Sequence, residues 1–121
     1  MEPGEQPYLY PYRSLLEVGV RVAPSSDAPH ASPDPWQTIA AADRVTTGGV
    51  VLGADERVDR ATVLAGFLSR PEDPGGTTRR VRPGTTADLC LLHVPLAHAL
   101  TAAPANPVRL TMAGGRTHTF G

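Results

Sequence analysis

Proline and glycine constrain this chain more than any other feature of its sequence. The 121 residues include 13 Pro and 12 Gly, against 1 Trp, 3 Tyr and 2 Phe. Proline lacks a backbone N–H and glycine has no side chain to pack, so both interrupt helices and strands and favour turns. The sequence therefore predicts short elements, many turns and a modest core, in a chain of one domain's length.

Charge and cysteine content exclude several classes of protein. Eleven Lys and Arg oppose 12 Asp and Glu, so the formal net charge of -1 gives no basic field that would attract nucleic acid. Cys90 has no partner for an internal disulfide, and its apolar neighbours predict a small buried hydrophobe. The amino terminus has no signal-like apolar segment, and no apolar run reaches the length of a membrane span. We therefore expect a cytoplasmic protein that binds neither nucleic acid nor membrane.

The first 23 residues predict an extended lead-in, a helix and a strand. Residues 1–11 lack periodicity. Residues 12–19 carry apolar side chains on one helical stripe and end at Gly19, a residue suited to a left-handed helix C-cap. Residues 20–23 alternate and are rich in Val, which predicts a strand that Pro24 ends.

Two more helices are predicted before residue 70. Asp34 followed by Pro35 combines a preferred N-cap with proline at the first helical position, and the apolar face of that helix would continue to Val45. Asp59 can cap a second helix, which must end before Pro71. Residues 71–78 are a linker loop by composition.

The last third of the chain, residues 79–121, is predicted to be rich in β-structure. Pro83 and Gly84 suit the centre of a type II turn, between residues 79–82 and an apolar strand over residues 87–92. A short helical turn over residues 96–100 and a strand over residues 108–112 follow, and Gly114 with Gly115 then reverses the chain.

Several short motifs, in this order, carry a resemblance to a known family. From about residue 8 to residue 121 the chain resembles the carboxyl end of amidohydrolase-superfamily enzymes, in the subgroup called amidohydrolase family 3. The motifs are Leu15-Leu16, Gly19-Val20, Ser26-Asp27-Ala28-Pro29, Asp34-Pro35-Trp36, Pro83-Gly84, Ala87-Asp88-Leu89 and Gly114-Gly115-Arg116.

The resemblance implies a fold of two parts. Residues 12–70 would be the last βα unit or units of a TIM-like barrel, with residues 20–23 as its eighth strand. Residues 79–121 would be the carboxyl-terminal strands of a small β-sandwich. The chain would then be an α/β fragment of a larger enzyme.

Asp27 is the candidate site residue. The resemblance implies that its carboxylate binds a divalent metal, zinc foremost, and takes a proton from the attacking water. In barrels, residues just past the strand ends project into the active site, which agrees with this placement. The structural alternative is an Asx turn between Pro24 and Pro29, which needs only a short polar side chain.

The other metal ligands implied by the resemblance are missing from the sequence. They would be a His-x-His pair, a Lys or Glu and two single His, whereas the four His of this chain show no ligand spacing. His30 shares the loop of Asp27 and could contact substrate or metal, but we interpret it as a solvated loop residue. We expect the other three to be surface residues: His93, His98 and His118.

Two functions from different classes follow. The first is a metal-dependent hydrolase of non-peptide carbon–nitrogen bonds, present as a carboxyl-terminal fragment that is inactive alone and binds no metal alone. Its partners would be the missing amino-terminal part or a second copy, with a small-molecule substrate. The second is a non-catalytic module that docks on a partner through exposed strand edges.

Overall fold

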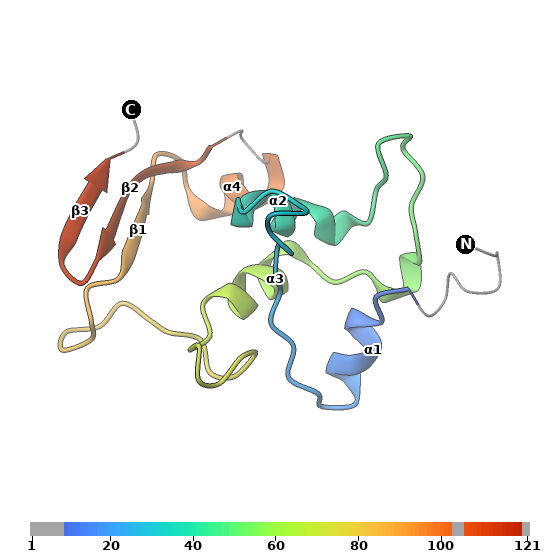
Figure 1. Ribbon diagram of the computed structural model, residues 1–121, viewed down its shortest axis with the longest axis horizontal. Coiled ribbons are helices and arrows are strands. Elements are labelled where there is room, and N and C mark those ends of the chain that lie inside the picture. The colour runs from blue at the N-terminus through green and yellow to red at the C-terminus, as the bar shows by residue number, and fades with distance from the viewer. Residues whose placement is uncertain (1–8, 103–105, 120–121) are drawn as a thin grey trace. The chain divides into compact units, whose positions relative to one another are not determined.

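Short helices and long connections follow from the proline and glycine content (Figure 1). The computed structural model describes residues 9–102 and 106–119. It is a small α/β structure that divides into two units, Met1–Arg79 (unit 1) and Arg80–Gly121 (unit 2). The assignment of unit 1 to the end of a TIM-like barrel and of unit 2 to the carboxyl-terminal part of a β-sandwich stays a prediction.

The described residues of unit 1 hold only helical elements. Helix α1 (Tyr12–Glu17) ends as predicted, at Gly19 with φ 81°. The Gly19 N–H donates to the Leu16 carbonyl (3.0 Å) and the Val20 N–H to that of Leu15 (2.9 Å), which is a Schellman cap. The later elements are α2 (Pro35–Ala40), the 3-10 helices η2 (Ala41–Asp43) and η3 (Ala54–Glu56), and α3 (Arg60–Phe67).

Both predicted aspartate N-caps are confirmed. The Asp34 carboxylate accepts the Trp36 N–H (2.9 Å) at the start of α2, and the Asp59 carboxylate accepts the Thr62 N–H (2.6 Å) at the start of α3. Hydrogen bonds from Thr62 hold the pKa of Asp59 below its usual value. A cap of this kind is typically worth about 1 kcal/mol, so each aspartate fixes where its helix begins.

The core of unit 1 is small and lies where α2 packs on α3. Ile39 and Val63 are each 2% exposed, and Ala42 is also buried. The helical face predicted to reach Val45 ends earlier, because Arg44 adopts a left-handed conformation (φ 58°) and Val45 is 53% exposed. The left-handed residue ends the helix and turns the chain away from the core.

The strand predicted for residues 20–23 is wrong, because these residues form no strand. A parallel strand needs neighbours on which to form a ladder, and no described segment pairs with this one. Two glycines hold it instead. A Cβ on Gly75 would lie 2.5 Å from the Val22 nitrogen, and a Cβ on Gly66 of α3 would lie 2.4 Å from Pro24 Cδ.

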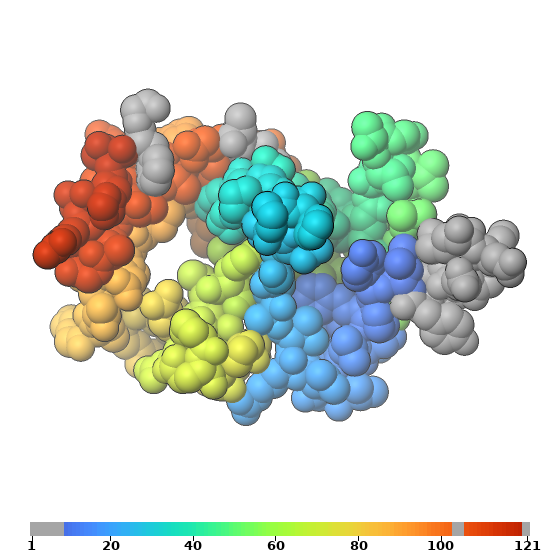
Figure 2. Space-filling view, in the orientation of Figure 1, coloured from blue at the N-terminus to red at the C-terminus, as the bar shows by residue number. Residues whose placement is uncertain are grey.

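The predicted loop of residues 71–78 is confirmed, and polar contacts anchor it. The Ser69 hydroxyl donates to the Gly66 carbonyl (2.6 Å) and accepts the Gly75 N–H (3.0 Å), and Ser69 is only 8% exposed. The Asp73 carboxylate pairs with Arg21. The space-filling view shows the loop, in yellow-green, against the extended segment that follows α1, in light blue (Figure 2). The loop therefore fixes the segment that leads to Asp27.

Unit 2 contains a three-stranded antiparallel sheet in the order β1-β2-β3 (Figure 1). Its elements are β1 (Leu89–Leu92), α4 (Leu96–Ala102), β2 (Val108–Ala113) and β3 (Arg116–Thr119). Gly114 and Gly115 make the predicted reversal with φ 55° and 79°, as a two-residue hairpin requires. The Asp88 carboxylate accepts the Gly114 N–H (2.7 Å) and so ties the hairpin to the start of β1.

The hairpin predicted around Pro83 and Gly84 forms only its turn. The Thr85 N–H donates to the Arg82 carbonyl (3.2 Å) and Gly84 has φ 88°, as a type II turn requires. Residues 79–82 form no strand, and β1 pairs with β2 instead. Val81 is 80% exposed among three arginines, so this segment has no apolar face to bury against a sheet.

Cys90 is exposed, which corrects the expectation of a buried residue. Both faces of β1 are open at this point, since Leu89 and Leu91 are exposed as well, and Cys90 lies opposite Thr111, which in turn lies opposite His118. These cross-strand neighbours share the more polar face of the sheet, while Leu89 and Leu91 point to the other face. Partial burial still raises the pKa of the Cys90 thiol.

The glycine contact with Val22 can be tested with a matched pair of substitutions. Gly75 (φ 70°) and Gly49 (φ 79°) have similar backbone conformations, but a Cβ meets the Val22 backbone only at Gly75. We expect Gly49→Ala to lower the free energy of unfolding by about 1 kcal/mol, the cost of the left-handed conformation. Gly75→Ala should cost at least about 2 kcal/mol more, since backbone must shift. Equal losses in urea denaturation would contradict this account.

Candidate functional site

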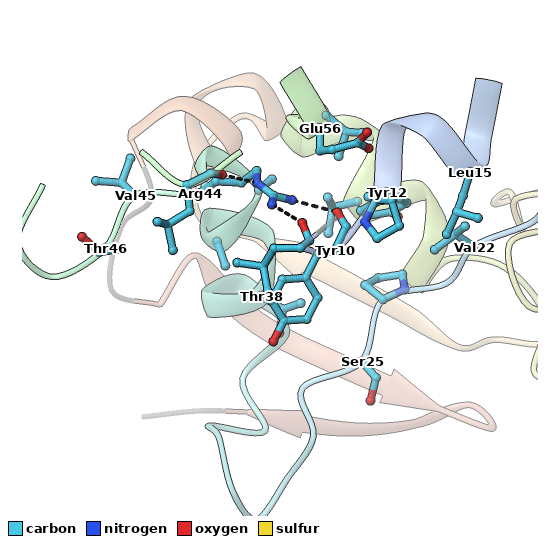
Figure 3. A pocket seen from close by; sticks show the side chains of 18 residues that line it. Tyr10, Tyr12, Leu15, Val22, Ser25, Thr38, Arg44, Val45, Thr46 and Glu56 are labelled. Carbon is cyan, nitrogen blue, oxygen red and sulfur yellow. Dashed lines mark hydrogen bonds between the residues drawn. The ribbon is translucent and has the colours of Figure 1, made fainter. Parts of the chain in front are cut away.

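A pocket of about 590 Å³ opens in unit 1 (Figure 3). Its walls come from the turn before α1, from α1 itself, from the extended segment after it and from residues 38–63. Most lining side chains are apolar, and Val63 of the core contributes to the wall. Two ionisable side chains of opposite charge, Arg44 and Glu56, line it as well.

Arg44 uses its guanidinium to join segments distant in the sequence. Nε donates to the Leu52 carbonyl (2.5 Å), Nη1 to that of Tyr10 (2.9 Å) and Nη2 to that of Leu9 (2.5 Å). The dashed lines of Figure 3 follow bonds of this guanidinium. The left-handed backbone of Arg44 starts a small hairpin closed by the Leu52 N–H on the Arg44 carbonyl (2.9 Å). One side chain therefore fixes two walls of the pocket.

Glu56 fixes the position of α1. Its carboxylate accepts the Ser14 N–H (2.9 Å) and also the Ser14 hydroxyl. The hydrogen bond from the Ser14 side chain is the main reason that the pKa of Glu56 lies below its usual value. Because Ser14 lies in the first turn of α1, the carboxylate takes up an N–H that the helix itself leaves unpaired.

Asp43 and Arg60 join η2 to the start of α3. Arg60 Nη2 lies 2.6 Å from Asp43 Oδ2, and Arg60 Nε lies 3.3 Å from Asp43 Oδ1, a two-point contact. The hydrogen bond from Arg60 holds the pKa of the Asp43 carboxyl below its usual range. Burial raises the pKa of the Tyr12 hydroxyl, so this lining group is neutral at ordinary pH.

Asp27 lies in an exposed turn and does not line the pocket. It has φ 54°, its N–H donates to the Ser25 hydroxyl (3.4 Å), and its carbonyl accepts the His30 N–H (2.9 Å). Among the described residues, none donates a hydrogen bond to its carboxylate. Ser25, two residues earlier, does line the pocket, so the turn begins at its rim.

The residues around Asp27 do not by themselves fit a complete metal centre. Within residues 9–102 and 106–119, no three His, Cys, Asp or Glu side chains gather closely enough to hold a metal ion. A catalytic zinc typically needs about three protein ligands. The four His are exposed, as expected, and His93 Nε2 donates to the Asn106 carbonyl (2.7 Å).

The comparison with protein families decides what this chain is related to. The model of the amidohydrolase family matches residues 1–118, nearly the whole chain. The chain belongs to the amidohydrolase family. Hydrolases of this family are generally metal-dependent, and the resemblance inferred from the order of short motifs is confirmed. No curated protein and no solved structure matches the chain.

The described part of this amidohydrolase chain contains no helix that is long and apolar enough to cross a membrane.

Sequence analysis identified Asp27 as the candidate site residue and did not identify Arg44 or Glu56, which line the pocket. The bonding partners of Arg44 lie up to 35 residues away and those of Glu56 lie 42 away. No local pattern connects residues at such separations.

Arg44 should not tolerate lysine, although the charge is kept. The three carbonyls lie in different directions around the planar guanidinium, and a single ammonium group cannot reach all of them. Lysine would therefore lose at least one contact to the pocket wall. We expect Arg44→Lys to lower the free energy of unfolding by about 2 kcal/mol. Arg57→Lys, at an exposed position of the same segment, serves as the control and should change it by less than about 0.5 kcal/mol. Similar losses of unfolding free energy in the two variants would contradict the role of the Arg44 guanidinium.

Acid should destabilise unit 1 through its hydrogen-bonded carboxylates. The pKa of Asp43 is lower in the folded chain than its ordinary value, so its contribution is complete above that value and disappears as the pH falls below it. We expect the free energy of unfolding to fall between about pH 6 and about pH 3, and to fall less in Asp43→Asn. Urea titrations at both pH values measure this, with Asp55→Asn, an exposed carboxylate, as the control.

Proposed function

We propose that this chain is part of a metal-dependent hydrolase that acts on non-peptide carbon–nitrogen bonds, and that Asp27 is one ligand of its divalent metal. The family match over residues 1–118 is the observation that carries this proposal. Zinc is the metal we favour, because the family resemblance implies it.

The local structure of the turn supports the assignment of Asp27. Its backbone is held at both ends, by Ser25 and His30, while its carboxylate is exposed and accepts no hydrogen bond from the described residues. A carboxylate that is held in place by its backbone, and that accepts no hydrogen bond within the protein, is available to an external ligand. In an Asx turn the same oxygens would accept a backbone N–H, and no such bond forms here.

Asp27 cannot hold a catalytic zinc alone, so we propose that the other ligands come from further polypeptide of the same enzyme or from a second copy. The 121-residue chain by itself should then be inactive. The small molecule hydrolysed would contain an amide-like carbon–nitrogen bond. In this proposal the residues of unit 1 position the carboxylate, and the missing ligands complete the centre.

A second candidate function is a non-catalytic module that docks through its strand edges. The order β1-β2-β3 leaves β1 and β3 at the edges of the sheet, and Leu91 is 53% exposed. Such an edge can accept a strand from a partner. This candidate predicts cooperative unfolding of the isolated chain and no dependence of its binding on Asp27.

The decisive comparison is between this chain and a longer version whose added sequence encodes a His-x-His pair. We expect zinc binding and amide hydrolysis only in the longer version. Asp27→Asn there should lower the hydrolysis rate at least about a hundredfold, because a ligand and proton acceptor is lost. Asp55→Asn is the matched control and should leave the rate unchanged. Hydrolysis by the 121-residue chain with zinc, or an active Asp27→Asn variant, would overturn the proposal.

A further inference from the structure

The pocket of unit 1 is lined by two charged side chains, Arg44 and Glu56, whose opposite charges sum to zero. All three guanidinium nitrogens of Arg44 donate to backbone carbonyls, and the Glu56 carboxylate accepts two bonds from Ser14. Both side chains therefore make their hydrogen bonds to the protein itself. A charged ligand would lose its hydration, would meet a like charge as well as an opposite one, and would have to compete with the hydrogen bonds that both groups already make to the protein.

The remaining wall suits an apolar group of small-molecule size. Leu15, Val22 and Pro24 line the pocket, and Tyr10 and Tyr12 add aromatic surface. The volume of about 590 Å³ falls within the range of about 300–1,000 Å³ that is usual for small-molecule sites. Aromatic rings offer stacking and edge contacts to a bound ring. Shape and chemistry thus favour an uncharged aromatic or branched aliphatic group.

We propose that this pocket binds the neutral, apolar substituent of a small amide. Ser25 belongs to the pocket wall and its hydroxyl accepts the Asp27 N–H, so a group seated in the pocket lies beside the turn that carries Asp27. The assignment of that group to the substrate rests on the function proposed above. The binding of an apolar molecule by the pocket does not, because it needs neither metal nor Asp27.

Binding can be measured on the 121-residue chain with 1-N-phenylnaphthylamine, a neutral dye that fluoresces in apolar surroundings. Ala41→Trp places a large ring at an exposed position of the wall, in η2. Ala54→Trp is the matched control, because Ala54 is an exposed alanine in η3 that does not line the pocket. Ala41 and Ala54 each accept a backbone N–H from the residue three positions later, so the two changes test the same local structure.

We expect saturable binding with one dye per chain. Ala41→Trp should weaken it at least about tenfold, while Ala54→Trp and Asp27→Asn should change it less than about twofold. The sulfonated analogue 8-anilinonaphthalene-1-sulfonate should bind at least about tenfold more weakly, because Arg44 is already hydrogen-bonded to three carbonyls and Glu56 adds a like charge to the wall. Acetanilide should displace the dye, and acetamide, which lacks the apolar group, should not.

Each outcome bears on one of the two proposals. Absence of saturable binding, or equal binding by the Ala41→Trp and Ala54→Trp variants, would overturn the pocket assignment and leave the role of Asp27 standing. Displacement by acetamide as effective as that by acetanilide would overturn the apolar specificity. If the dye still binds the 121-residue chain but Asp27→Asn retains full hydrolysis in the longer version, the metal-ligand proposal is contradicted and the pocket assignment stands.

Discussion

The structure of unit 1 depends on the close approach of two glycines to one extended segment. Gly66 brings α3 against Pro24, and Gly75 brings the following loop against the backbone of Val22. Neither contact leaves room for a Cβ atom. These contacts hold the extended segment in place, although it pairs with no strand among the described residues. The segment forms one wall of the pocket and leads into the turn of Asp27.

Ionic side chains complete the framework that the glycines begin. Arg44 joins the backbone before α1 to the hairpin after η2, Glu56 holds the first turn of α1, and Arg60 joins Asp43 to α3. Few apolar side chains are buried among residues 9–102 and 106–119, so such contacts connect segments that a larger core would otherwise hold. Arg44 and Glu56 also line the pocket with opposite charges that sum to zero, so the same contacts bear on the ligand preference proposed above.

The family relationship and the structure of this chain answer different questions. Membership in the amidohydrolase family, shown over residues 1–118, points to hydrolysis. The Asp27 carboxylate accepts no hydrogen bond from the described residues and belongs to a turn that begins at Ser25 of the pocket wall, and the described residues gather no set of metal ligands. In the function proposed above, this chain would position a carboxylate and offer apolar surface, and the remainder of the enzyme would supply the other ligands.

The sequence by itself determined the features that depend on neighbouring residues. The caps by Asp34 and Asp59, the Gly19 helix end, the type II turn at Pro83 and Gly84, and the strands around Gly114 were all predictable, because backbone conformation and short-range hydrogen bonds decide them. Tertiary structure alone decided that residues 20–23 lie outside a sheet, that Cys90 faces solvent and that Arg44 reaches three distant carbonyls. Those outcomes depend on which segments meet across tens of residues, and no local pattern of side chains records such a meeting.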